Sequence, residues 1–290
     1  MGGGNKLLAG GISLGLLAGA LGTGALVWWG DRGLTRFSLN DTGYFGDSTY
    51  AGGADKTGHF FANFVGIKAA TAIYESIGLE HGSALAFATA LSLTLGTSVE
   101  LIDGFTSYGF EYNDVVANVL GLALGLATEL VPALDETVGI REAYLPSPGF
   151  IRGPKSYIKL INDYTGQIIY ADLKLKGVAH LFGLSPGPAR YFLLGVNWST
   201  KNYEPGGPDP EWHDRERHLG MHLGVNLSEV FTELDLGGTS RFGRAFFKYY
   251  ALPFLNVSLV RDLNGDRWFW NFGIANRLTT YASPPPMSRP

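Results

Sequence analysis

Side chains that could transfer protons or bind a metal ion gather in the first half of the chain. Asp55, His59 and Asn63 recur every four residues, so a helix would carry all three on one face. Glu100 and Asp103, three residues apart, form a second polar group near the end of another apolar segment. Carboxylates and histidine at short range can hold a divalent cation or activate water. Such chemistry requires a fold that brings the two groups together.

Three apolar segments, roughly residues 55–78, 82–103 and 113–131, are each long enough for a helix of about 30 Å. Short turns that contain glycine separate the segments, and short connections favour antiparallel neighbours. The polar ends of all three then meet at one end of a bundle, where Asp114 and Asn118 join the other groups. Small residues predict close helix contacts there, including a G-x-x-x-G spacing at Gly121 and Gly125.

The favoured role for this polar cluster is a structural hydrogen-bond network. Asp55 and Asp114 lie where the start of a helix favours an acid. Glu100 and Asp103 lie at a helix end, where the dipole opposes an acid, so a cation is expected beside them. Lys56, a protonated histidine or a bound cation could supply that charge.

Two other roles stay open, a metal or ligand site and a catalytic acid–base site. Both use the same predicted residues, His59, Glu100 and Asp103. In the enzyme hypothesis His59 is a general base or a metal ligand, and the two carboxylates act as acid, base or metal ligands. The cofactor is unknown, with a divalent metal as the candidate. The rest of the predicted cluster consists of Asp55, Lys56, Asn63, Asp114 and Asn118.

A set of spaced motifs runs through residues 28–125: Trp28-Trp29, Gly43-Tyr44-Phe45-Gly46, Thr49 to Lys56, Gly58-His59-Phe60, Glu100, Asp103-Gly104, Gly109-Phe110, Asp114, Asn118 and Gly121. Together they resemble the YfiM-like family, a group of uncharacterised bacterial envelope proteins known as predicted lipoproteins with a domain of unknown function. A looser likeness is to VanZ-like membrane proteins, which also pair Asp-Lys-x-x-His with a later acid and Asp-x-x-x-Asn. The resemblance implies an envelope location and no particular chemistry. Two features depart from it, since Glu111 stands where Ser is expected and the absence of cysteine leaves no site for a lipid.

Composition favours the same location. Only 17% of the 290 residues are charged, against roughly 25% in ordinary soluble proteins, and 46% are hydrophobic. The net charge of −4 gives no reason to expect a nucleic-acid partner. The absence of cysteine excludes disulfides and thiol catalysis. We expect membrane lipid or an envelope protein as the partner, and the oligomeric state is open.

Residues 1–30 are predicted to be a signal peptide or a membrane anchor, because the chain is apolar from Leu7 to Trp29. Ala18-Gly19-Ala20 fits a cleavage site, whereas Trp28 and Trp29 suit the interface end of an uncut anchor. Both hypotheses export the remainder of the chain to the periplasm or outer membrane, anchored in the inner membrane if the segment is not cleaved.

The second half of the chain changes its pattern. After a helical bundle domain at 31–131, prolines indicate a linker over 132–156. Alternating segments within 157–280 predict five antiparallel strands, at 168–176, 190–203, 218–230, 248–261 and 267–278. Residues 281–290 are predicted to be a disordered tail. The fold class is therefore α+β, a three-helix antiparallel bundle followed by a C-terminal antiparallel sheet that could form a partial barrel.

These observations predict an exported bacterial envelope protein with a structural or interaction role at a membrane. The first alternative is a membrane-associated hydrolase that acts on a lipid or cell-wall substrate through the histidine and carboxylate cluster. The second is a small outer-membrane pore. A closed barrel of that kind needs about eight strands, more than the five found in the sequence.

Overall fold

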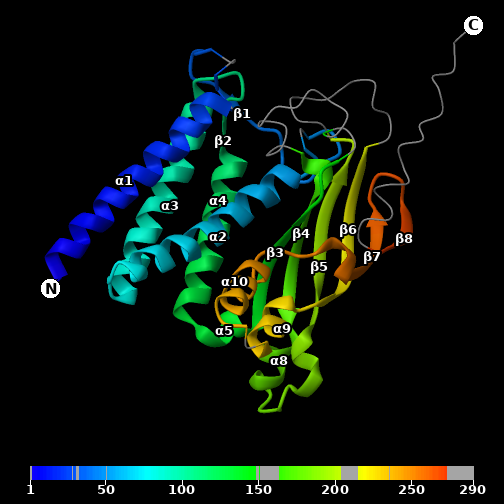
Figure 1. Ribbon diagram of the computed structural model, residues 1–290. Coiled ribbons are helices and arrows are strands. Elements are labelled where there is room, and N and C mark those ends of the chain that lie inside the picture. The colour runs from blue at the N-terminus through cyan, green and yellow to red at the C-terminus, as the bar shows by residue number, and fades with distance from the viewer. Residues whose placement is uncertain are drawn as a thin grey trace, which may run out of the picture. The chain divides into compact units, whose positions relative to one another are not determined.

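The computed structural model describes residues 2–27, 29–30, 33–49, 51–147, 150, 163–203, 215–234 and 236–272. The chain divides into two compact units, Met1–Ile140 and Arg141–Pro290, which we call the helical unit and the sheet unit. Together they give the predicted α+β fold, with a helical bundle first and an antiparallel sheet second (Figure 1).

The helical unit contains α1 (Gly2–Val27), α2 (Ala54–Ser76), α3 (His81–Gly104), α4 (Tyr112–Leu130) and α5 (Pro132–Thr137). The predicted three-helix bundle is confirmed, because α2, α3 and α4 all pack against one another (Figure 1). Apolar and small side chains from all three helices form its core, namely Ile67 and Tyr74 of α2, Ala84 and Ala88 of α3 and Leu122 of α4. The bounds of the three helices agree with the predicted segments to within one or two residues at each end.

Glycines set both ends of α2. Gly53 precedes the helix in a left-handed conformation, with φ of 93°. Gly78 follows it with φ of 87°, a conformation that favours glycine. The Gly78 N–H donates to the Glu75 carbonyl at 2.8 Å, and the Leu79 N–H donates to the Tyr74 carbonyl at 3.1 Å. This pair of bonds is a Schellman motif, which ends the helix and turns the chain into α3.

Two short strands fix the chain that precedes α2. β1 (Leu39–Asn40) pairs in parallel with β2 (Phe110–Glu111), so Asn40 lies beside Glu111. Just before β1, the Ser38 N–H donates to the Gly104 carbonyl at 2.9 Å. This contact holds the segment against the turn between α3 and α4 and places Glu111 at the start of α4.

The apolar helix α1 packs on the bundle through few side chains. Ala9 is fully buried in the bundle core, and the Ser13 hydroxyl lies 2.7 Å from the hydroxyl of Tyr74. Two helical segments, Gly4–Leu26 and His81–Gly104, are long and apolar enough to cross a membrane. The second is also a bundle helix, so length and composition alone do not assign it to lipid. Whether α1 is a cleaved signal or an anchor stays a prediction.

The sheet unit is built on six strands that are neighbours in chain order: β3 (Val138–Tyr144), β4 (Gln167–Lys174), β5 (Phe192–Lys201), β6 (Glu216–Val225), β7 (Asn256–Asp262) and β8 (Arg267–Asn271). β3 crosses the boundary between the units. Among the described residues of this unit the α-helices are α8 (Leu175–Leu181), α9 (Leu227–Glu233) and α10 (Gly238–Phe247). Within the described residues β3 and β8 are the two edges, so the sheet is open and does not close into a barrel (Figure 1).

Some segments differ from the sequence analysis. Residues 132–144, assigned to the linker, contain α5 and β3, because Pro132 occupies the first turn of α5, where a missing N–H costs nothing. The segment 218–230, expected to be one strand, ends in helix α9, where the Asn226 side chain caps the helix by accepting from the Glu229 N–H. The predicted tail, 281–290, lies outside the described residues, and the domain limits remain predictions.

Candidate functional site

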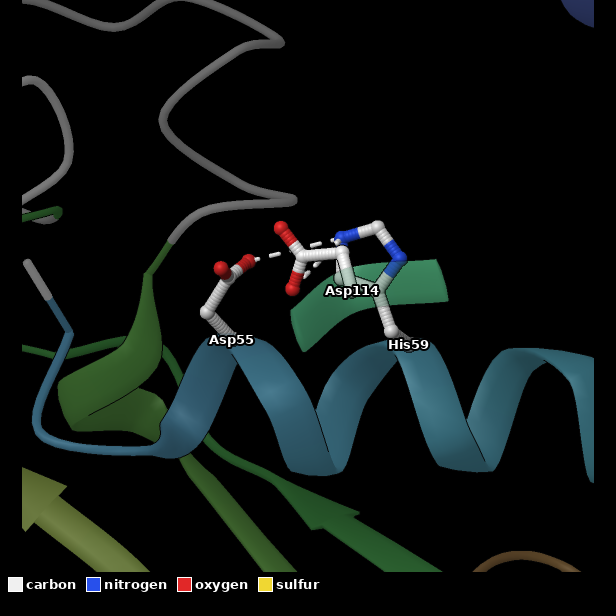
Figure 2. Close-up of side chains that lie close together, drawn as sticks. All are labelled: Asp55, His59 and Asp114. Atoms are coloured by element: carbon white, nitrogen blue, oxygen red, sulfur yellow. Dashed lines mark ion pairs between the residues drawn. The ribbon is translucent and has the colours of Figure 1, made fainter. Parts of the chain in front are cut away.

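The polar ends of α2, α3 and α4 meet in one group of side chains, which we call the His59 cluster: Asp55, Lys56, His59, Glu100, Glu111, Asp114 and Asn118. Asp55 and His59 lie one turn apart on α2. Figure 2 shows both side chains directed toward Asp114, which comes from α4. The antiparallel arrangement of the three helices therefore brings together acids that are far apart in sequence.

Lys56 is the centre of positive charge in this cluster. Its ammonium lies 2.7 Å from Glu111 Oε1, 2.7 Å from Asp114 Oδ1 and 3.0 Å from Asp55 Oδ2. The lysine side chain is 4% exposed, so these contacts are shielded from water. Burial alone would lower the pKa of Lys56, but the neighbouring carboxylates outweigh it and raise the pKa. The lysine is therefore held in its charged form.

Acidic side chains also surround His59. Its Nε2 lies 3.6 Å from Asp55 Oδ1 and 3.9 Å from Asp114 Oδ1 (Figure 2). Its Nδ1 lies 3.7 Å from Glu100 Oε1. The His59 side chain is 26% exposed, whereas the Glu100 side chain is 1% exposed. Glu100 Oε1 has no hydrogen-bond partner among the described residues. The histidine is thus the accessible member of a group whose acids are largely buried.

A chain of amides orients the imidazole. Asn63 donates its Nδ2–H to Asn118 Oδ1 at 2.6 Å, and the same oxygen lies 3.0 Å from His59 Nδ1. An amide oxygen can only accept, so this contact keeps a proton on Nδ1. Proton exchange is then left to Nε2, the nitrogen that faces Asp55 and Asp114.

The protonation states follow from burial and charge. Burial lowers the pKa of His59, but the three neighbouring carboxylates outweigh it and raise the pKa to about 9. Burial raises the pKa of Glu100 to about 8, against the opposing charge of His59. Burial and the charge of Asp55 raise the pKa of Asp114 to about 7. At neutral pH the histidine is therefore a cation, and Glu100 keeps its proton.

Glycines allow the helices to approach closely beside the cluster. A Cβ on Gly121 of α4 would lie 2.0 Å from the carbonyl oxygen of Phe60, which is next to His59 on α2. A Cβ on Gly125 would lie 2.4 Å from the side chain of Ile67. These contacts explain the G-x-x-x-G spacing, since larger residues would separate α2 from α4 and move Asn118 away from His59.

The predicted site residues do not all belong to the His59 cluster. Asp103 lies at the end of α3 and accepts a hydrogen bond from Trp29 Nε1 at 2.6 Å. Glu111, noted in the sequence only as a departure from a family pattern, is a direct partner of Lys56. Thr42 donates to Glu111 through both its N–H and its hydroxyl. The signal that could have identified Glu111 was the buried lysine, which needed more than one acid.

A metal ion would find ligands in part of this cluster. Asp55, His59 and Asp114 each offer one ligand atom, and these atoms lie within 4.8 Å of one another. This set differs from the predicted metal ligands, His59, Glu100 and Asp103. Lys56 and a protonated His59 already supply positive charge there, and a metal ligand must be a neutral imidazole. Metal binding at this site therefore stays a prediction.

A second polar network lies in the sheet unit. Arg141 of β3 donates to Asp172 of β4 at 2.6 Å, and His222 Nε2 of β6 lies 2.8 Å from the same carboxylate. The side chains of His222 and Asp172 are 0% and 1% exposed. Burial raises the pKa of Asp172, but Arg141 and His222 outweigh it and lower the pKa. The network is closed to solvent, which favours a structural role.

A third group, Glu216, His218 and Asp262, could also hold a metal by distance alone. Cations already occupy its acids, since Lys201 Nζ lies 2.6 Å from Glu216 and Arg267 Nε lies 3.1 Å from Asp262. This group is therefore compensated by protein charges.

Comparison with known proteins bears on the helical unit. Residues 41–129 match a family described as a predicted periplasmic lipoprotein, DUF2279, a domain of unknown function. The match covers less than a third of the chain and contains every member of the His59 cluster. No curated protein and no solved structure matches the chain. The match supports the coarser part of the resemblance, an uncharacterised envelope family, and the YfiM-like and VanZ-like likenesses remain resemblances. The protein is thereby placed in the bacterial cell envelope.

Proposed function

We propose that the protein is a membrane-associated hydrolase of the cell envelope, with the His59 cluster as its acid–base site. The observation that carries this proposal is the geometry around the imidazole. His59 is accessible, at 26% exposed, while carboxyl groups from three helices lie within 3.9 Å of its two nitrogens. Accessible titratable groups beside buried acids of shifted pKa are typical of acid–base sites.

The protonation states assign the roles. At its pKa of about 9, His59 carries a proton at neutral pH and acts as an acid, not as the general base that the sequence suggested. The Asp114 carboxyl, with a pKa of about 7, is the base. Water adds to an ester or amide carbon and loses a proton to Asp114. The bond between the carbonyl carbon and the leaving oxygen or nitrogen breaks, and the leaving atom takes the Nε2 proton of His59. The proton on Asp114 then passes to His59 Nε2, 3.9 Å from Asp114 Oδ1, which restores both groups for the next cycle.

The substrate class follows from location. An envelope protein with an apolar helix at its start meets lipids and cell-wall polymers, both of which contain ester or amide bonds. We therefore propose an envelope lipid or a cell-wall polymer as substrate.

A structural role at the membrane is the second candidate. Lys56 contacts three carboxylates within 3.0 Å, and such a compensated network can serve stability alone. The two candidates differ in their response to loss of the imidazole, because the three acids on Lys56 keep that lysine as a partner while hydrolysis loses its acid.

Purified protein incubated with phospholipid vesicles or with peptidoglycan tests the proposal, with products followed by mass spectrometry from pH 6 to 10. We expect hydrolysis with a bell-shaped pH dependence centred near pH 8, and a loss of about 100-fold or more in His59→Gln and Asp114→Asn. His81→Gln is the matched control, since His81 is an exposed histidine that pairs with Glu75 at 2.7 Å. No product from either substrate, or equal rates in all variants, would favour the structural role.

A further inference from the structure

One face of the sheet is apolar and exposed across five strands. Strand register places side chains from neighbouring strands in rows, for example Leu173, Leu194, Leu223 and Val257 in one row, and Val196, Met221, Leu259 and Trp270 in the next. Most of these are large hydrophobic residues left exposed, such as Met221 at 57% and Trp270 at 58%. We call this surface the apolar face. A contiguous exposed apolar surface of this kind is uncommon on a soluble protein and marks an interaction site.

The opposite face of the same strands is polar and buried. Asp172, His222 and Ser258 occupy one row across β4, β6 and β7, and each is less than 5% exposed. Asn197 of β5 donates to Ser258 at 3.1 Å and His222 Nε2 lies 2.8 Å from Asp172, while His222 Nδ1 has no hydrogen-bond partner among the described residues. A sheet in water usually covers its apolar side and solvates its polar side. Here the two sides are exchanged, as in sheets whose outer surface contacts lipid.

Charge at the border of the apolar face indicates what kind of surface it meets. Strand alternation puts Arg217 of β6 and Arg261 of β7 on this face, at the end where Trp268 also lies. Arg261 lies over the Trp268 ring, 5.8 Å from its centre, and also pairs with Asp266, whereas Arg217 donates to the neutral Asn264 side chain at 2.6 Å. Tryptophan and arginine side by side at the edge of an apolar band suit the boundary between acyl chains and anionic headgroups.

An open edge decides between spanning and lying on a membrane. Within the described residues β8 has a partner strand on one side only, whereas Glu142 of β3 also forms backbone hydrogen bonds with Tyr249 and Ala251. Unpaired strand edges do not occur in the hydrocarbon region, because their N–H and C=O groups would lose water without gaining partners. A sheet of this form therefore contacts one leaflet with its face and does not cross the bilayer.

The geometry points to the apolar face of β4 to β8 as a lipid-docking surface that rests on an anionic leaflet, with Arg217 and Arg261 at the headgroups. This inference is independent of the His59 cluster. It assigns the predicted lipid partner to a defined surface, and it can fail while the hydrolase proposal stands.

The absence of cysteine from the chain allows a direct test on the full-length protein. A nitroxide label attached to Met221→Cys reports contact with lipid at the apolar face. Thr232→Cys, exposed on α9, is the matched control. Collision with oxygen, which concentrates in lipid, is compared with collision with a water-soluble nickel complex. Vesicles contain phosphatidylethanolamine with or without phosphatidylglycerol. A local label is required because α1 alone could hold every variant on vesicles.

We expect vesicles with phosphatidylglycerol to raise the oxygen-to-nickel ratio at position 221 several-fold and to leave the ratio at position 232 unchanged. Adding Leu194→Asp and Leu223→Asp should return the label at position 221 to its value in water. Arg217→Gln with Arg261→Gln should reduce the preference for phosphatidylglycerol. A ratio at position 221 that vesicles do not change would overturn the inference. Spin–spin broadening without vesicles would assign the face to a second copy of the chain and would overturn it as well.

Discussion

At the scale of single residues, Lys56 decides how the acids of the His59 cluster coexist. Its ammonium contacts Asp55, Glu111 and Asp114 within 3.0 Å in a buried setting. Removing one partner from a buried ion pair costs about 3–5 kcal/mol. We expect Lys56→Met to lower the free energy of unfolding by about that amount at pH 8, and by less at pH 5, where Asp114, whose pKa is raised to about 7, carries a proton. Urea denaturation followed by circular dichroism measures both values. Equal loss at the two pH values would contradict this account.

The same variant tests the metal hypothesis. Without Lys56, Asp55 and Asp114 keep only the charge of His59 beside them, and a divalent cation could supply the charge that is missing. A ligand that binds only the folded state stabilises it by about 2.7 kcal/mol at 100 times its Kd. We expect Mn²⁺ to raise the midpoint of thermal unfolding of Lys56→Met and to leave that of the unsubstituted protein unchanged. A rise of equal size in both would show instead that the cluster binds metal with its lysine in place.

Glu100 links the stability of the helical unit to pH. Burial raises its pKa from 4.5 to about 8, so it stabilises the fold below pH 4.5 and loses that contribution as pH rises through 8. His59, with a pKa raised from 6.5 to about 9, acts in the same direction up to pH 9. The midpoint of thermal unfolding, followed by ellipticity at 222 nm, should therefore fall from pH 5 to pH 9. Glu100→Gln keeps the shape of the side chain without titrating, so it should reduce the fall of the midpoint below pH 8. An unchanged slope would mean that Glu100 does not hold a proton in the folded state.

At the scale of elements, the contact between α2 and α4 depends on glycine. Gly121→Ala would bring a methyl group to 2.0 Å from the Phe60 carbonyl oxygen. Because this oxygen belongs to the backbone, one of the two helices would have to move. We expect a loss of about 1–3 kcal/mol in the free energy of unfolding, despite the better helix propensity of alanine. Gly66→Ala is the control, because no atom lies within 4 Å of its added Cβ. That variant should gain up to about 1 kcal/mol. Equal effects in the two variants would show that propensity, not packing, governs these positions.

The sequence predicted the long helices because their signals are local. Segments with apolar residues at helical spacing, bounded by Gly53 and Gly78, gave the extent of α2 to within two residues. The convergence of Asp55, Glu100 and Asp114 followed from helix length and short turns alone. Local patterns did not reveal β3, a buried strand without alternation. The short helix α9 lay inside an alternating segment and was marked only by its Asn226 cap.

The chemistry of the site was less predictable than its position. The protonated state of His59 depends on how deeply its partners are buried, which spacing does not give. The partnership of Lys56 with Glu111 depends on the pairing of β1 with β2, a contact between segments about 70 residues apart. The sequence likewise predicted that side chains alternate along the strands, but it did not show which face of the sheet is buried.

At the scale of the whole molecule, the two compact units carry titrating groups that change stability with pH in opposite directions. In the sheet unit, burial raises the pKa of Glu216, but His218 and Lys201 outweigh it and lower the pKa to about 2. A carboxylate of lowered pKa contributes stability above its ordinary pKa of 4.5 and loses it as pH falls toward 2. Asp172, whose pKa is also lowered, acts in the same direction. The sheet unit is therefore the acid-sensitive half, and the helical unit is the alkali-sensitive half.

We therefore expect two unfolding transitions whose order depends on pH. Between pH 5 and pH 3 the sheet unit should lose stability first, and between pH 7 and pH 9 the helical unit should. Glu142 of the sheet unit has a pKa raised by burial to about 7. The stability that it contributes at low pH is therefore largely lost before the alkaline range begins.

Two probes separate the units in one thermal scan. Ellipticity at 222 nm reports mainly the long helices, whereas four of the six tryptophans belong to the sheet unit, so fluorescence reports mainly the sheet. At pH 3 the fluorescence midpoint should come below the ellipticity midpoint, and at pH 9 it should come above. Glu216→Gln should remove part of the acid shift from the fluorescence midpoint alone. Coincident midpoints at every pH would mean that the units unfold as one cooperative block, in which the charges of the His59 cluster and those of the sheet contribute to a single transition.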